Sequence, residues 1–333
     1  MKALLSVFFL CCSQDSGVLV ATIPDGVRTS LVSFSNDGKT VAYHAFKGRD
    51  LWAVVGDWES QPSPGPCLVV LLENGKDFIY AAFEREKVSV FLREKLLFET
   101  TNPREWAWTM PGAVSSDGAV VASYVRHLKT GKSAVALNGK LQELHAGTGS
   151  SPVLSRDGKT WAFALEKEDG HCVVVNDKPG PVFDWVTQPV ISADGAVVAY
   201  GAESEKDNLL ILGSQRLSVK KSAKGVFMTS DGKTAGYWGP AKKGDPKGGL
   251  QVVIGDHEGP AFASIQPPCF SPDGKHVVYR ATRTDGTWVL VLDDRILEAE
   301  GIQADPVFMA DGKRVGYGIR KGNEFRWMTL GVE

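Results

Sequence analysis

The stretch CFSPDGKHVVYRA, from Cys269 to Ala281, holds two apolar runs separated by the turn-forming residues Pro272, Asp273 and Gly274. Asp-Gly between two such runs predicts a β-hairpin, because glycine accepts the positive φ that a tight turn requires. Closely similar stretches recur along the chain, each with a glycine followed by an apolar run. The turn glycines are Gly38, Gly75, Gly118, Gly158, Gly195, Gly232, Gly274 and Gly312.

The repeat has a period of roughly forty residues, which is typical of arrays in which each unit covers the apolar face of its neighbour. Each unit continues beyond the hairpin with a third apolar run, such as WVLVLDD at Trp288 to Asp294, and a less regular fourth run. Four antiparallel strands repeated radially are the blade of a β-propeller. We therefore predict an all-β chain that folds as a single β-propeller.

Eight turn glycines predict eight blades, with seven as the alternative because the repeat at Gly75 has Asn74 where the others have aspartate. The residues after Gly312 suffice for two strands of a blade but not for a further one. We expect the missing strand to come from Gly17 to Val32, so that the N-terminal and C-terminal strands share the last blade. Such closure removes the free sheet edges that favour aggregation.

Two columns of the repeat are predicted to lie in the core. The residue four positions before the turn glycine is apolar in every unit, and the residue five positions after it is aromatic in all units but one, where Ser123 stands. The first column is Phe34, Leu71, Val114, Leu154, Ile191, Met228, Phe270 and Phe308, and the second is Tyr43, Tyr80, Ser123, Phe163, Tyr200, Tyr237, Tyr279 and Tyr317.

The aspartate before the turn glycine is interpreted as a structural residue. Its carboxylate is expected to accept a hydrogen bond from the backbone N–H two residues further on. A cation-binding ring of these aspartates is the alternative, but each one is required by its own turn. The predicted turn pairs are Asp37 with Gly38, Asp117 with Gly118, Asp157 with Gly158, Asp194 with Gly195, Asp231 with Gly232, Asp273 with Gly274, and Asp311 with Gly312.

The overall composition is that of a folded globular protein. Apolar residues make up 43% of the 333 residues, and 37 Lys and Arg against 39 Asp and Glu give a net charge of −2. This balance gives no electrostatic reason for a nucleic-acid partner, and beyond the N-terminal run no apolar stretch approaches the length of a membrane span. We expect a monomer. Because Cys67, Cys172 and Cys269 are widely spaced, we predict neither a disulfide framework, nor a metal site, nor a cofactor.

The N-terminus has the shape of a secretory signal. Lys2 precedes an apolar run from Ala3 to Cys12, and small residues follow it. We expect residues 1–16 to be an export signal and residues 17–333 to form the propeller, which places the protein in the periplasm or outside the cell. The alternative is a cytoplasmic protein that keeps Met1.

The segment FSPDGKHVVY and the similar segments of the other repeats resemble the repeats of the TolB-type, WD-like β-propellers of bacteria. The full match is Ser271 to Lys275, and other repeats replace Pro272 by other residues. The resemblance covers residues 17–333 and implies an envelope-associated propeller that binds other proteins. It also implies that some relatives are enzymes or accessory domains of enzymes.

Propellers bind partners through their faces or their central channel. Four tryptophans lie near blade links or loop starts and are candidates for a recognition patch for protein or sugar, with packing as the open alternative: Trp106, Trp108, Trp185 and Trp238. The longest loop, Pro240 to Gly249, adds Lys242, Lys243 and Lys247, either as a binding flap or as a solvated insertion.

No arrangement in the sequence identifies a catalytic residue. The six histidines are scattered over different repeats, and no nucleophile elbow or phosphate-binding loop occurs. We therefore predict a non-enzymatic module that binds another protein, with a glycan or a small ligand as other possible partners. The alternative is an enzyme acting on glycans, a hydrolase or a lyase, with ionisable side chains from different blades converging at the mouth of the channel.

Overall fold

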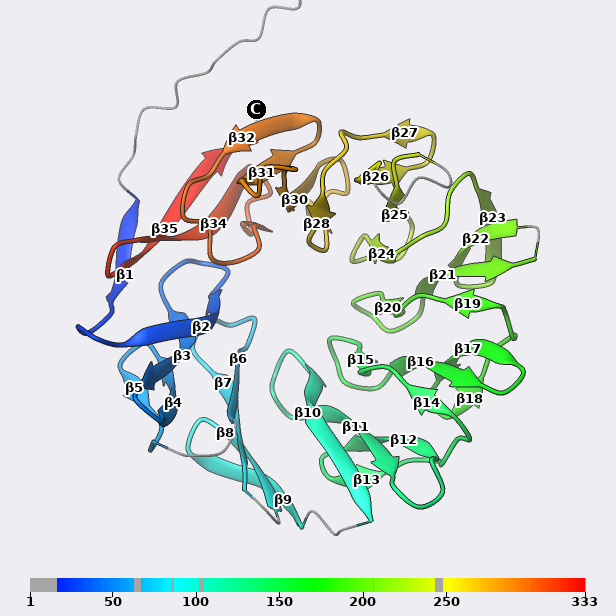
Figure 1. Ribbon diagram of the computed structural model, residues 1–333, viewed down its shortest axis with the longest axis horizontal. Helices are drawn as coiled ribbons and strands as arrows, with labels where there is room; N and C mark the ends of the chain where they lie inside the picture. Colours follow the sequence, from blue (N-terminus) through cyan, green and yellow to red (C-terminus); the bar gives the residue numbers. More distant parts are fainter. Residues whose placement is uncertain are drawn as a thin grey trace, which may run out of the picture.

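The computed structural model describes residues 17–62, 67–84, 87–101, 105–205, 207–242 and 248–332. Within these residues the strands form eight antiparallel sheets arranged as a ring, so the predicted eight-bladed propeller is confirmed (Figure 1). The candidate export signal at residues 1–16 lies outside the described residues. Among the described residues, none belongs to a helix of the length and apolarity needed to cross a membrane.

Each blade presents an inner strand to the axis of the ring. The inner strands of blades one to eight are β2 (Arg28–Phe34), β6 (Cys67–Leu71), β10 (Trp106–Val114), β14 (Thr148–Gly149) with β15 (Val153–Leu154), β19 (Trp185–Val186) with β20 (Val190–Ile191), β24 (Gly225–Met228), β28 (Ser264–Ile265) with β29 (Cys269–Phe270), and β33 (Val307–Phe308). In blades four, five and seven the inner strand is divided in two. The division falls at Pro152, Pro189 and Pro268, since proline lacks the N–H that the ladder requires.

The second strand of each blade carries the aromatic residue of the repeat. These strands are β3 (Val41–Lys47), β7 (Phe78–Phe83), β11 (Val121–His127), β16 (Trp161–Lys167), β21 (Val198–Ser204), β25 (Ala235–Pro240), β30 (Val277–Thr282) and β34 (Arg314–Lys321). The third strands are β4 (Asp50–Val55), β8 (Lys87–Leu92), β12 (Ser133–Leu137), β17 (Gly170–Val175), β22 (Asp207–Leu212), β26 (Leu250–Ile254), β31 (Trp288–Leu292) and β35 (Glu324–Gly331).

The outer strands are β5 (Trp58–Glu59), β9 (Lys95–Thr101), β13 (Lys140–Leu141), β18 (Lys178–Pro179), β23 (Gln215–Val219), β27 (His257–Glu258), β32 (Arg295–Glu298) and, in blade eight, β1 (Val18–Thr22). β1 pairs with β35, from Val18 opposite Trp327 to Thr22 opposite Glu324. The expectation that the two ends of the chain share the last blade is therefore confirmed, and Figure 1 shows the blue β1 beside the red β35.

All eight turn glycines have positive φ, between 66° and 73°. Each of the seven aspartates accepts a hydrogen bond from the N–H two residues on, as at Lys159 N to Asp157 Oδ1, 3.1 Å. In the repeat at Gly75, the side-chain oxygen of Asn74 accepts the same bond from Lys76 at 2.9 Å. The predicted structural role of the turns is thus confirmed, and the repeat without aspartate forms the same turn.

The core is divided into eight apolar clusters, one at each interface between blades. The aromatic column supplies many of these residues; Phe163 and Tyr279, for example, are almost fully buried. The other predicted core column is different. Its residues pack against these clusters but remain half-buried, and five of them line a cavity on the axis: Leu71, Val114, Leu154, Ile191 and Met228.

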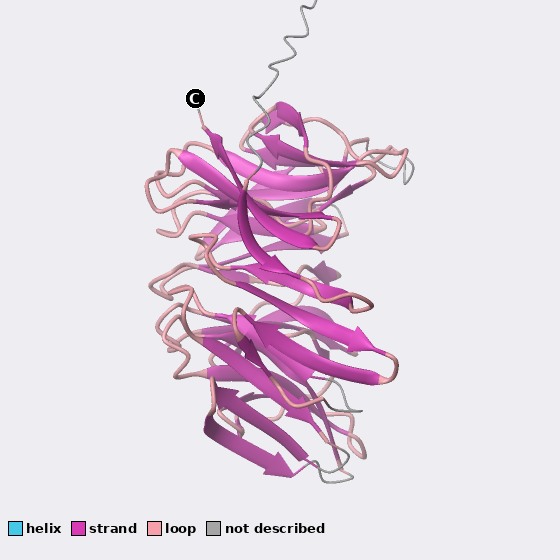
Figure 2. Cartoon of the chain, turned by 90° about the vertical axis from the view of Figure 1, so that its left-hand side faces the viewer, coloured by secondary structure: helices cyan, strands magenta, loops and turns pink. Residues whose placement is uncertain are grey.

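The hairpin turns and the loops lie on opposite faces of the ring. Figure 2 shows connections gathered along two opposite sides, with the strands running between them. One side carries the Asp-Gly turns and the turns between third and outer strands; we call it the turn face. The other carries the loops between second and third strands and the links between blades; we call it the loop face.

Candidate binding site

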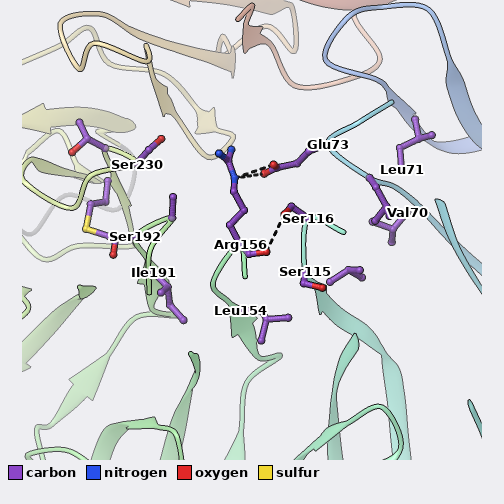
Figure 3. Close-up of a pocket in the computed structure, with 15 residues that line it drawn as sticks. Val70, Leu71, Glu73, Ser115, Ser116, Leu154, Arg156, Ile191, Ser192 and Ser230 are labelled. Carbon is purple, nitrogen blue, oxygen red and sulfur yellow. Dashed lines mark hydrogen bonds and ion pairs between the residues drawn. The ribbon is translucent and has the colours of Figure 1, made fainter. Parts of the chain in front are cut away.

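A cavity of about 330 Å³ lies on the axis, at the turn face, between the inner strands of blades two to six. Its wall is the half-buried apolar column, and its rim is made by serine, threonine and alanine residues of the turns. Arg156 of blade four reaches across to Glu73 of blade two, with 2.9 Å between Arg156 Nε and Glu73 Oε2 (Figure 3). The carbonyl of Arg156 accepts hydrogen bonds from the N–H and hydroxyl of Ser116, which fixes the turn that carries the guanidinium.

The charged groups at this cavity are one ion pair, Glu73 with Arg156. Of the residues that line it, Glu73 and Arg156 are the ionisable ones. Two ionisable groups from different blades therefore do converge at the channel mouth, as the enzymatic alternative requires. They are a carboxylate and a guanidinium, however, whereas glycoside hydrolysis normally uses two carboxyl groups about 5–10 Å apart.

Two of the candidate tryptophans lie at the loop face. Trp106 begins β10 and meets His127 edge-on, with ring centroids 4.7 Å apart. Trp185 begins β19 in blade five; it is 47% exposed, and its ring lies 4.9 Å from that of His171 in blade four. Blade four lies between them in the ring (Figure 1), so both flank the same sector of the loop face.

The other two tryptophans are engaged in packing. Trp108 packs against the cluster between blades two and three, and its Nε1 is buried without a hydrogen-bond partner among the described residues. Trp238 lies over Gly225, where a Cβ would come within 2.1 Å of the indole ring. Of the candidate lysines, Lys242 is exposed, and Lys243 and Lys247 lie outside the described residues.

A hollow of about 720 Å³ lies between blades three and four on the loop face. It is lined by Thr130 and Lys132 of blade three and by Ala146–Thr148 and Glu166–Asp169 of blade four. Thr130 connects the hollow to Trp106 through His127: its N–H donates to His127 Nδ1 at 3.2 Å, and His127 contacts Trp106. Asp169 joins it to the Trp185 side, because Gly170 and His171 follow it directly.

Exposed apolar side chains accompany each tryptophan. Leu128, next to His127, is 58% exposed, and Val182, which lies against Gly170, is 42% exposed. The hollow and its two flanks form one surface, which we call the loop-face patch. Its members, besides the lining of the hollow, are Trp106, His127, Leu128, His171, Val182 and Trp185.

Charge around the loop-face patch is balanced. Lys167 pairs with Asp169 at 3.2 Å, and Lys129 pairs with Glu105 at 2.7 Å. The hydrogen bond from Lys129 lowers the pKa of the Glu105 carboxyl. A rim with charges of both signs around exposed aromatic and aliphatic side chains favours an uncharged or mixed-charge partner surface over a nucleic acid.

The part of the chain that the structure describes holds no group of three or more His, Cys, Asp or Glu residues placed to bind a metal ion. The thiols of Cys67, Cys172 and Cys269 are free. Burial raises the pKa of Cys269 to about 11, so this thiol does not behave as an activated nucleophile.

Sequence reasoning did not identify several residues that the structure makes important. In six of the eight repeats a buried serine or threonine stands three positions before the turn glycine and donates to the turn aspartate, as Ser155 Oγ does to Asp157 at 2.7 Å. Leu72 and Met309 take its place in the other two. The regular occurrence of this hydroxyl in the repeat was the available signal. By contrast, Glu73 with Arg156 and Trp185 with His171 join different repeats, and periodicity carries no signal for them.

The similarity of this chain to known proteins supports its fold and does not establish a function. No family model matches the chain, and no curated protein matches it significantly. The Dos1 propeller superposes with a TM-score of 0.53 at 12% identity, over 93% of each chain. The chain is a β-propeller.

Weaker likenesses include an oligogalacturonate lyase in complex with manganese, with a TM-score of 0.48 at 14% identity over 85% of this chain and 95% of that one. TolB from Acinetobacter baumannii gives a TM-score of 0.35 at 13% identity, and the match covers 93% of this chain and 63% of TolB. At these TM-scores neither likeness supports a conclusion about this chain.

Proposed function

We propose that this propeller is a non-enzymatic interaction scaffold that binds another protein through the loop-face patch. The observation that carries the proposal is Trp185, a large aromatic side chain left 47% exposed against His171, which follows Asp169 of the 720 Å³ hollow by two residues. Tryptophans in such settings are over-represented among residues that dominate protein–protein binding energy. The repeat's resemblance to TolB-type propellers agrees with a binding role.

The test is capture of partners by immobilised protein comprising residues 17–333, with Trp185→Ala as the variant. The matched control is Leu217→Ala, because Leu217 lies in the same blade on β23 and is also exposed, at 42%. From an envelope extract of the native cells, we expect a defined protein that the parent and the Leu217 variant retain and the Trp185 variant loses. Equal capture by all three proteins would contradict a role for the loop-face patch.

We further propose that the protein is exported, on the basis of Lys2 and the apolar run that follows it. Sequencing the N-terminus of the native protein tests this directly. A first residue near Gly17 supports cleavage of a signal, and a retained Met1 supports the cytoplasmic alternative.

The enzymatic alternative rests on the Glu73–Arg156 pair at the axis. Polysaccharides, including acidic ones, would be incubated with the parent and with Arg156→Ala. Chain cleavage by the parent that the variant lacks would replace the scaffold proposal with the enzymatic one.

A further inference from the structure

A second cavity, of about 300 Å³, lies between blades six and seven, where it opens at the turn face. Blade six contributes Val252 and Ile254 of β26, and blade seven contributes Phe270, Val277 and Tyr279. These five residues form the apolar part of the wall, and Thr234, His257, Lys275, Asp293 and Asp294 form its polar part. Ligand sites in proteins are typically apolar concavities of this size or larger that contain a few placed polar groups.

The cavity contains a polar group without a protein partner. Tyr279 is 1% exposed, and its hydroxyl has no hydrogen-bond partner among the described residues. The buried hydroxyl of Tyr124, by comparison, lies 2.7 Å from Ser133 Oγ and accepts a bond from Gly149 N–H at 3.0 Å. A buried hydroxyl left unpaired costs free energy, so the Tyr279 hydroxyl calls for a partner that enters the cavity.

Gly259 shows where this hydroxyl points. A Cβ on Gly259 would lie 3.6 Å from the Tyr279 hydroxyl and 3.7 Å from Asp294 Oδ1. The two oxygens thus face the same point of the cavity wall, and they form a polar corner beside its apolar part. Asp294 is held there from blade six by His257, whose Nε2 lies 3.1 Å from Asp294 Oδ1.

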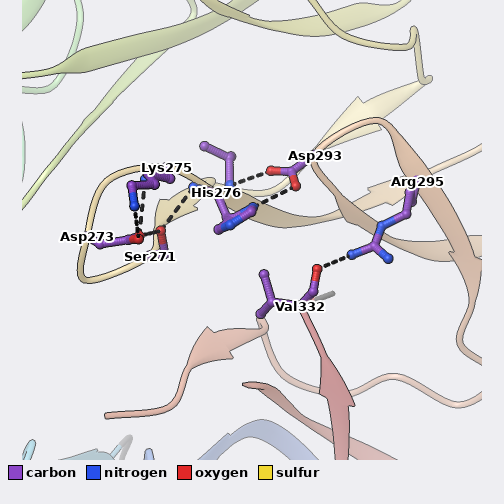
Figure 4. A network of polar contacts seen from close by, with 8 residues as sticks. Ser271, Asp273, Lys275, His276, Asp293, Arg295 and Val332 are labelled. Atoms are coloured by element: carbon purple, nitrogen blue, oxygen red, sulfur yellow. Dashed lines mark hydrogen bonds and ion pairs between the residues drawn. The ribbon is translucent and has the colours of Figure 1, made fainter. Parts of the chain in front are cut away.

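The charged side chains next to this corner form hydrogen bonds and ion pairs with residues at the rim of the cavity. Asp293 accepts from Val277 N–H at 2.9 Å and contacts His276 Nδ1 at 3.0 Å, while Lys275 pairs with Asp273 at 3.4 Å (Figure 4). Two carboxylates, those of Asp293 and Asp294, line the cavity together with one lysine, Lys275. This arrangement favours a cation over an anion in the corner.

Burial, and after it the charge of Asp294, raises the pKa of Tyr279. The phenol therefore keeps its proton and retains oxygen lone pairs that accept. The Asp294 carboxylate also accepts hydrogen bonds. An ammonium group satisfies both oxygens at once, because it carries three N–H donors and its charge complements that of the Asp294 carboxylate.

We propose that the cavity between blades six and seven binds a small primary amine with an apolar body, the ammonium group lying at Tyr279 and Asp294 and the body against Val252, Phe270 and Val277. This site lies on the turn face, opposite the loop-face patch. Its test is therefore independent of the proposed protein-binding role.

The test uses 2-phenylethylamine as the probe and measures its binding to the folded protein, residues 17–333, by calorimetric titration. We expect saturable binding with a Kd of about 1 mM or lower, as suits a fragment-sized ligand. Phenylacetate and 2-phenylethanol have the same apolar body with an anionic or a neutral end. We expect each to bind at least about tenfold more weakly, since charge-assisted hydrogen bonds are the stronger ones.

Three variants locate the binding to the cavity. Gly259→Ala places a methyl group in the polar corner at ordinary contact distances, so the fold is expected to tolerate it and binding to be lost. Tyr279→Phe removes the unpaired hydroxyl and is expected to weaken binding several-fold with no loss of thermal stability. Tyr200→Phe, at the same position of the repeat in blade five, is the matched control and should leave binding unchanged.

Two results would overturn the proposal. One is the absence of saturable binding of 2-phenylethylamine to protein that is shown to be folded, which would mean that the cavity holds water alone. The other is binding that Gly259→Ala and Tyr279→Phe leave as tight as in the parent. Equal affinity for 2-phenylethanol and 2-phenylethylamine would overturn the assignment of an amine.

Discussion

At the scale of single residues, the hydroxyl three positions before the turn glycine organises the hairpin. Ser155 Oγ donates to Asp157 and accepts from Thr160 N–H at 2.9 Å. Ser155 is almost fully buried. One side chain thereby satisfies both the aspartate and the backbone of the second strand. The serine is thus part of the hydrogen-bonded turn, together with the Asp-Gly pair.

We expect Ser155→Ala to lower the free energy of unfolding by about 1–3 kcal/mol, because the half-buried Thr160 N–H loses its acceptor. Urea denaturation of the variant and the parent measures the difference. Ser151→Ala, at an exposed position of the same blade, is the control and should change stability by less than about 0.5 kcal/mol. Equal effects of the two substitutions would contradict the role given to Ser155.

The turn aspartates also predict how stability depends on pH. Hydrogen bonds from the Ser155 hydroxyl and from the backbone of Lys159 hold the pKa of Asp157 at about 2, below its usual 3.8. The corresponding bonds from Thr229 and Lys233 do the same for Asp231, also to about 2. A carboxyl with a depressed folded-state pKa stabilises the fold above its unfolded pKa, and the contribution is lost as pH falls toward the folded value.

We therefore expect the melting temperature to fall between about pH 4 and pH 2. The double variant Asp157→Asn, Asp231→Asn should show a shallower fall over the same interval, because the amide oxygen accepts the turn hydrogen bonds without titrating. Thermal melts followed by circular dichroism at stepwise lower pH give both curves. Superimposable slopes for parent and variant would refute this origin of the acid sensitivity.

At the scale of elements, the ring depends on one strand from the far end of the chain. β1 is the outer strand of blade eight and pairs with β35, and Arg326 binds the carbonyl of Gly17 at 3.2 Å. Blade eight also contacts blade one, since the indole of Trp327 lies against Gly38. Loss of β1 leaves the backbone of β35 unpaired on one side, which is a template for aggregation.

We expect a protein that begins at residue 23 to melt at a lower temperature and to aggregate more readily than a protein that begins at residue 17. Differential scanning calorimetry and light scattering on heating measure the two effects. The protein that begins at residue 17 should in turn match the full-length chain. If removal of residues 17–22 changes neither property, β1 does not close the ring in solution.

At the scale of the whole molecule, the outer strands determine whether copies of the ring associate. Four of those described are two residues long, and each of the four carries a lysine or a glutamate, for example β13 (Lys140–Leu141) and β27 (His257–Glu258). Short, charged edge strands disfavour pairing between sheets. Such edges favour a ring that remains single in solution.

We therefore expect a monomer of 35.9 kDa less any removed leader. Size-exclusion chromatography with multi-angle light scattering, over a range of concentrations, measures this mass. Dimer formation would point to β9 (Lys95–Thr101), the longest outer strand described, as the edge that pairs. Leu96→Lys would then be expected to restore the monomer.

The architecture of this protein follows from its amino-acid sequence alone. The Asp-Gly turn, the apolar runs around it and the period of about forty residues are local properties of each unit, and local patterns that agree with one another specify one fold. Gly17 to Val32 was also expected to supply the missing strand, because the last repeat lacked one. Even the hydroxyl of the turn was present as a regular feature of the repeat.

The sites were decided by the tertiary structure alone. Arg156 contacts Glu73, Trp185 contacts His171, and Tyr279 faces Gly259. Each contact exists because the ring places residues of different blades next to one another. These contacts join residues that the repeat pattern treats as unrelated, and they differ from one blade interface to the next. Periodicity therefore predicts the blades, whereas the irregular side chains between blades create the candidate binding sites.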